Sequence, residues 1–139
     1  MSATKTLSQC MTEMREALES FDASKPERIG SPSLGDVVRQ GDLYLIAIES
    51  LPNGKKTNQR QLVPGTTQGS RHVVEGDATI VNEVQFKDIP AALVGPAFKC
   101  NSETTISHPE HGDKILPADT VWQCVYQQAY ADEIRRVQD

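Results

Sequence analysis

The sequence lacks several features that would place it in a well-known class of protein. No apolar run approaches the ~20 residues that a membrane-spanning helix needs, and the N-terminus carries three glutamates in place of the apolar core of a signal peptide. A G-x-S-x-G nucleophile elbow and a Gly-Lys-Thr phosphate loop are missing as well. We therefore expect a soluble cytoplasmic protein that does not act at a membrane.

Basic charge and cysteine are also scarce. The chain has 14 lysines and arginines against 19 acidic residues, a net charge of −5. Binding to a nucleic-acid duplex depends on a basic face, so duplex DNA or RNA is not an expected partner. Cys10, Cys100 and Cys124 are an odd number with no C-x-x-C spacing, which favours reduced thiols in a cytosol.

At 139 residues, of which 37% are hydrophobic, the chain has the size of one domain with a modest core. The clearest element is an amphipathic helix from Leu7 to Phe21, with a capping box at Thr6 and Gln9. Apolar residues recur there at three- and four-residue steps, which is typical of one helix face. The residues expected to form an interface are Leu7, Met11, Met14, Leu18 and Phe21.

Residues 22–35 are rich in Ser, Pro and Gly, and this composition predicts a linker or a long surface loop. We therefore divide the chain into an N-terminal helix and linker, residues 1–35, and a β-rich domain, residues 36–139. The helix either packs on its own domain or meets another chain, and the sequence leaves both open.

From Gly41 onward the pattern is that of strands. Residues 43–48 are apolar on both faces, as in a central strand that is covered on each side. Residues 55–60 are polar and are expected to form a hairpin tip. Shorter strands are predicted at 60–63, 72–74, 78–86, 91–94, 97–100, 104–106 and 121–127. The predicted fold is mainly β, a small barrel or sandwich with a jelly roll as one form, with one N-terminal helix.

Three histidines are the main candidates for chemistry. His108, Glu110 and His111 lie within one short turn, and His72 comes from a different predicted strand. Imidazole and carboxylate groups are ligands that zinc, iron or manganese accept, so these four residues form a candidate metal site. The alternative is a pair of exposed turns, and the distance between His72 and the other two histidines decides between them.

A second candidate is the loop before His72. Thr66, Thr67, Ser70 and Arg71 combine hydroxyl groups with a positive charge, and two glycines permit unusual backbone angles. Such a loop can bind a small anion such as a nucleotide. A solvated loop between strands is the alternative.

The order of several short motifs resembles a family of small uncharacterised bacterial proteins. The motifs are Gly41-Asp42-Leu43-Tyr44-Leu45, His72-Val73-Val74-Glu75-Gly76-Asp77, His108-Pro109-Glu110-His111 and Gln127-Gln128-Ala129-Tyr130. Ala129 stands where the family pattern has an acid. The resemblance implies a shared β-rich fold and a shared histidine site, but no activity.

Three functions compete. The first, which we favour, is a non-catalytic module that self-associates or docks a protein partner through the helix and the β domain. The second is a cupin-like metal-dependent enzyme that uses His72, His108 and His111. The third is a protein that binds or sequesters a small anionic ligand.

Overall fold

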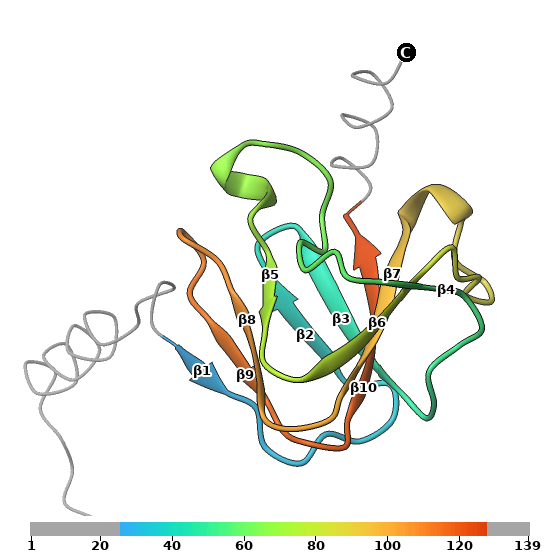
Figure 1. The fold of residues 1–139 in the computed structure, drawn as a ribbon, viewed down its shortest axis with the longest axis horizontal. Coiled ribbons are helices and arrows are strands. Elements are labelled where there is room, and N and C mark those ends of the chain that lie inside the picture. Colours follow the sequence, from blue (N-terminus) through green and yellow to red (C-terminus); the bar gives the residue numbers. More distant parts are fainter. Residues whose placement is uncertain (1–25, 128–139) are drawn as a thin grey trace, which may run out of the picture.

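The computed structural model describes residues 26–127. The predicted helix, with Leu7, Met11, Met14, Leu18 and Phe21, lies outside them. Within them, ten strands form two sheets (Figure 1), so the prediction of a mainly β domain is confirmed. The helical elements of this part are two three-residue 3-10 turns, η1 (Gln68–Ser70) and η2 (Ala91–Leu93). No described helix has the length and apolarity needed to cross a membrane.

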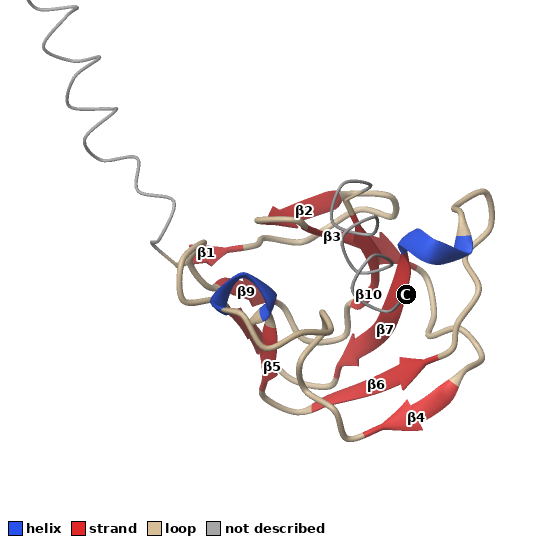
Figure 2. Cartoon of the chain, turned by 90° about the horizontal axis from the view of Figure 1, so that it is seen from above, coloured by secondary structure: helices blue, strands red, loops and turns tan. Residues whose placement is uncertain are grey.

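The two sheets differ in size and curve around a common interior (Figure 2). Sheet A has the order β1 (Glu27–Arg28), β9 (Lys114–Leu116), β8 (Thr104–Ser107), β5 (Val73–Glu75). Sheet B has the order β2 (Val37–Gln40), β3 (Leu43–Ile48), β10 (Val121–Tyr126), β7 (Val94–Cys100), β6 (Ala78–Asn82), β4 (Lys55–Thr57). The pair β1–β9 is parallel, and the other strand pairs are antiparallel.

The core lies between the sheets and follows the alternation of side chains along each strand. In β3, Leu43, Leu45 and Ala47 are buried, while the intervening side chains are half-buried, so its outer face is only partly covered. In β10, Trp122 and Cys124 belong to the core. The other buried core residues are Val38, Leu62, Val63, Val74, Ile80, Phe98, Cys100, Ile106 and Leu116.

Several local predictions were wrong. Residues 55–57, expected at a hairpin tip, form β4, and residues 91–93, expected in a strand, form η2. Residues 27–28, expected in the linker, form β1, whose backbone bonds to β9 give it its place in sheet A. The strands β2 and β9 were not predicted.

The strands around Gly76 also differ from the prediction. Residues 72–74 and 78–86 were expected to be consecutive strands, but β5 belongs to sheet A and β6 to sheet B. Gly76, with φ of +126°, lies at the crossing between the sheets. Its Cβ, if present, would lie 3.2 Å from the Glu103 carbonyl oxygen, so the crossing needs glycine for space and for conformation.

The two sides of the domain are closed to different degrees. On one side, the segment after β4 bonds to β5, with Leu62 N–H donating to the His72 carbonyl at 2.8 Å and Val74 N–H donating to the Arg60 carbonyl at 2.9 Å. This segment therefore continues sheet A toward β4 of sheet B. On the other side, β1 and β2 are the edge strands of their sheets within the described residues.

Candidate functional site

The structure brings the three histidines together. β5 pairs with β8 so that Val73 lies opposite Ser107, which places the preceding His72 beside the following His108. The ring centroids of His72 and His108 are 4.3 Å apart, and those of His108 and His111 are 4.6 Å apart. The convergence that the sequence left open is therefore present, as one cluster with His72 and His108 buried and His111 half-buried.

Gln40, at the end of β2, organises this cluster. Its side-chain amide nitrogen donates to the Ile106 carbonyl at 2.8 Å and to the Gly112 carbonyl at 2.7 Å. The amide oxygen is then the acceptor toward His72 Nδ1, 2.8 Å away, so His72 carries its proton on Nδ1. Gln40 is only 1% exposed, and it connects sheet B with β8 and with the turn that carries His111.

The tautomer of His108 follows from its own contacts. The backbone N–H groups of Glu110 and His111 donate to His108 Nδ1 at 3.0 and 3.1 Å, so this nitrogen is an unprotonated acceptor. In the neutral ring the proton lies on Nε2, which donates to the Gly69 carbonyl at 3.1 Å. Both nitrogens of His108 are therefore occupied by backbone groups.

His72 is held in its neutral form. Burial lowers its pKa to about 3, the neighbouring His108 and His111 act in the same direction, and a hydrogen bond with the Gly69 backbone opposes them. At neutral pH the buried ring therefore carries no charge. This is the state in which it can pack 4.3 Å from His108 without repulsion.

This arrangement bears on the candidate metal site, namely His72, His108, Glu110 and His111. Across residues 26–127, no three His, Cys, Asp or Glu side chains are grouped so that they could hold a metal ion. His108 would have to give up a backbone bond to become a ligand, and Glu110 is exposed. Metal binding stays a prediction that the positions of these side chains do not support.

The ring of His111 packs on the turn between β2 and β3. Gly41, with φ of +57°, lies at this turn, and a Cβ there would come within 2.8 Å of His111 Nε2. The absence of a side chain at position 41 thus lets the ring lie close to the backbone. Together with Gln40, this contact fixes the β2–β3 hairpin to the loop after β8.

The four residues of the candidate anion-binding loop differ in their exposure to solvent. The hydroxyls of Thr67 and Ser70 lie 3.1 Å apart across η1, with Ser70 buried. Thr66, Thr67 and Arg71 are exposed. Buried and exposed members do not form one surface, and binding of an anion by these four residues stays a prediction.

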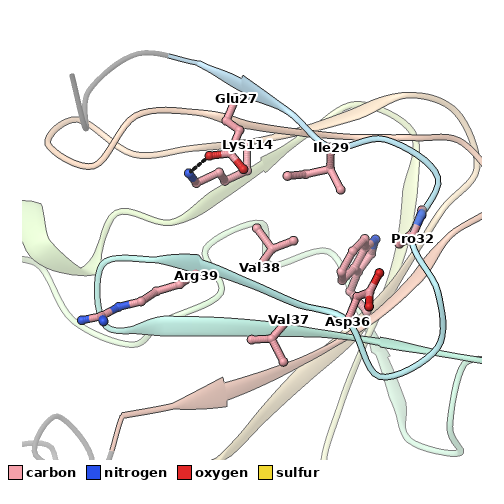
Figure 3. Close-up of a pocket in the computed structure, with 9 residues that line it drawn as sticks. Glu27, Ile29, Pro32, Asp36, Val37, Val38, Arg39 and Lys114 are labelled. Carbon is pink, nitrogen blue, oxygen red and sulfur yellow. Dashed lines mark hydrogen bonds and ion pairs between the residues drawn. The ribbon is translucent and has the colours of Figure 1, made fainter. Parts of the chain in front are cut away.

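A cleft that the sequence did not reveal lies between β1 and β2 (Figure 3). It has a volume of about 440 Å³. Ile29 and Val38 point toward the space between the two strands, whereas Val37 points away to the outer face of sheet B. The lining residues are Glu27, Ile29, Pro32, Asp36, Val37, Val38, Arg39, Lys114 and Trp122.

The accessible lining of the cleft is more polar than apolar. Trp122, which is fully buried, and Val38 line it from sheet B, and Ile29 lines it from the segment after β1. On the rim, Lys114 forms an ion pair of 3.1 Å with Glu27. The cleft therefore presents mainly polar surface, and Trp122 and Val38 are buried beneath it.

One signal in the sequence could have located the cleft. A two-residue loop that begins with glycine joins paired strands of a hairpin. Gly41-Asp42 fits this pattern, but Val37–Gln40 before it was not predicted as the partner strand of β3. The β1 side gives no such signal, because two residues held by backbone bonds leave no side-chain pattern.

Comparison with known proteins identifies a family but does not indicate an activity. No curated protein and no solved structure is detectably similar to the chain. A family described as a domain of unknown function, DUF8820, matches residues 39–127, which include all three histidines but not β1. This agrees with the resemblance to an uncharacterised family. Since the match covers more than half of the chain, the protein belongs to the DUF8820 family of domains of unknown function.

Proposed function

We propose that this protein is a non-catalytic assembly module that self-associates through the side of the domain formed by β1 and β2. The observation that carries the proposal is the position of Leu34 and Val37, which are 67% and 57% exposed. Within residues 26–127 they are the large hydrophobic side chains that are exposed. Both lie in the stretch from Glu27 to Arg39 that borders the cleft, and a local concentration of exposed apolar groups marks an interaction surface.

The strand edge at β2 supports the same surface. An edge strand leaves a row of backbone amides unpaired, and proteins commonly protect such a row with lysine. β4, the opposite edge of sheet B, carries exposed Lys55 and Lys56. β2 instead presents Val37 and Arg39 outward, so it is the less protected edge.

The histidine cluster favours a structural role over catalysis. His108 uses both ring nitrogens on the backbone, and His72 uses Nδ1 on Gln40. A general base or metal ligand needs a free lone pair that faces a substrate. With both of its ring nitrogens engaged, His108 offers no such lone pair, which weakens the enzyme alternative.

We also propose a reducing cytoplasmic setting. Cys100 and Cys124 are free and buried. Burial raises the pKa of both thiols, which keeps them protonated and unreactive. Neither thiol is exposed for disulfide formation.

The test is the mass of the full chain in solution. We expect light scattering to show an oligomer for the wild type and a monomer for the double variant Leu34→Lys/Val37→Lys. Burying two unpaired charges in an interface should weaken association by about 100-fold or more. The matched control is Ala92→Lys, which adds the same side chain at an exposed position on η2 and should leave the mass unchanged. A wild type that is monomeric at every soluble concentration would contradict the proposal.

A further inference from the structure

We propose that Asn53 is a site of spontaneous deamidation and that its isoaspartate product weakens the pairing of β4 at the edge of sheet B. Asn53 and Gly54 form the only Asn-Gly pair in the sequence, and they lie in the bend that leads into β4. The modification uses water as its co-reactant and needs no enzyme. It does not depend on the proposed self-association.

The reaction joins the Asn53 side chain to the backbone that follows it. The backbone nitrogen of Gly54 loses its proton to the solvent and attacks Cγ of Asn53, so that a C–N bond forms and the side-chain nitrogen leaves as ammonia. Water then adds to one of the two carbonyls of the cyclic succinimide and breaks one of its two C–N bonds. The products are aspartate and isoaspartate, and the net reaction converts an amide and water into a carboxylate and ammonium.

Both reacting groups in this bend are accessible. Asn53 and Gly54 are exposed, and within residues 26–127 neither the Asn53 side chain nor the Gly54 N–H has a hydrogen-bond partner. The attack therefore has no hydrogen bond to break. Glycine has no Cβ, so no side chain on residue 54 shields the attacking nitrogen. Asparagine is a thermolabile residue in proteins, and this position leaves it without protection.

The other described asparagines lack this combination. The side-chain amide of Asn101 donates to Asp77 Oδ1 at 3.3 Å and to Thr79 Oγ1 at 3.1 Å, which holds it in place. Asn82 is half-buried in β6, and a glutamate follows it. Asn58 is exposed but precedes a glutamine, whose side chain hinders the approach to the backbone nitrogen. Asn58 and Asn101 therefore serve as internal references for the rate at Asn53.

The contacts of Gly54 explain why the product affects β4. A Cβ at Gly54 would lie 2.5 Å from the Asn82 carbonyl oxygen and 2.7 Å from Val84 Cγ1, so the backbone here packs closely against the end of β6. The next residue, Lys55, pairs with Asn82. Isoaspartate adds one carbon to the main chain, a length of about 1.5 Å. Because β4 pairs with β6 alone among the described strands, this extra length displaces the strand from its only partner there.

Incubation of the full chain in mildly alkaline buffer tests the site. Peptide mass spectrometry identifies each deamidated asparagine, because the reaction replaces NH by oxygen in the mass of the peptide. We expect Asn53 to deamidate on the order of tenfold faster than Asn58 or Asn101, since its neighbour has no side chain. The matched control is Asn53→Gln, which keeps an amide at this exposed position but closes a larger ring more slowly. Equal rates at Asn53 and Asn58 would overturn the proposal.

Hydrogen exchange of the backbone amides tests the effect on β4. The isoaspartate form, separated from the aspartate form by chromatography, should exchange the β4 amides about fivefold faster than the unincubated wild type, or more. Freshly prepared Asn53→Asp carries the new negative charge without the longer main chain, and its exchange should match that of the wild type. Faster exchange in Asn53→Asp as well would assign the effect to charge and overturn the role of main-chain length. Unchanged exchange in the isoaspartate form overturns the weakening of β4 and leaves the deamidation site standing.

Discussion

On the β4–β5 side of the domain the main chain connects sheets A and B, whereas near β2 a side chain makes the connection. Leu62 N–H and Val74 N–H bond to backbone carbonyls on the first side. On the second side the Gln40 amide reaches the Ile106 and Gly112 carbonyls of the facing sheet and turn. Side-chain substitution leaves the first connection in place, but one substitution removes the second. The connection on the β1–β2 side is therefore the more sensitive of the two to substitution.

The largest effect is expected from Gln40→Leu. The change leaves the Nδ1–H of His72 without its acceptor and removes two bonds to buried carbonyls. Each buried polar group that loses its partner costs about 1–3 kcal/mol, so the free energy of unfolding should fall by on the order of 4 kcal/mol. Urea denaturation monitored by Trp122 fluorescence measures it.

The matched control on the other side is Gln61→Leu. The Gln61 amide also donates to two backbone carbonyls, those of Val63 at 2.7 Å and Gly65 at 2.8 Å. These bonds are local and partly exposed, so the loss should stay within about 1 kcal/mol. Equal losses for the two variants would show that Gln40 has no special role in holding the sheets together.

The second effect is a loss of stability in acid. The ordinary pKa of His72 is 6.5, and in the folded chain it is about 3. Between these values the unfolded chain binds a proton that the folded chain does not bind, so stability falls as pH decreases. From pH 7 to pH 4 the loss should be about 3 kcal/mol.

The measurement is the urea midpoint as a function of pH, for the wild type and for His72→Gln. The variant should be less stable at pH 7 but should show a shallower decline between pH 6.5 and 4. An identical decline in both proteins would assign the acid sensitivity to other groups.

The smallest expected effect is the loss of stability on replacing either of two glycines on the β1–β2 side by alanine. Gly35 and Gly41 both have positive φ, +86° and +57°, so alanine at either should cost about 1 kcal/mol of backbone strain. At Gly41 the new methyl group also meets the His111 ring, whereas nothing lies within 4 Å at Gly35. We expect Gly41→Ala to cost about 2–3 kcal/mol in thermal unfolding. His111→Ala in the Gly41→Ala background should recover the excess; without recovery, the contact with His111 is not its cause.

The strands β3 and β10 were predictable because each is long enough to show its pattern. In β10, residues 121–125 are all buried, and Trp122 and Cys124 belong to the core. The residues 91–93 were not predictable in this way. Three small apolar residues after Pro90 fit a strand or a 3-10 turn equally well, and the backbone of the surrounding loop decides.

The histidine cluster and the cleft could not be predicted from the periodicity of apolar residues. The sequence identified the histidines, but their meeting depends on the pairing of β5 with β8, which lie about 30 residues apart in the chain. The tautomer of His72 depends on Gln40, a residue that belongs to no recognisable motif. The cleft arises because two sheets end beside each other, and no local pattern records which strands lie at the edges.

Because Gln40 lies on the same short strand as Val37 and Val38, His72 can report on the position of that strand. Any displacement of β2 would move the Gln40 amide oxygen that accepts the His72 proton. That proton is buried and exchanges slowly with water, so its nuclear magnetic resonance should be visible near neutral pH and should move when β2 is displaced. If the proposed self-association moves β2, this resonance would report it without an added label.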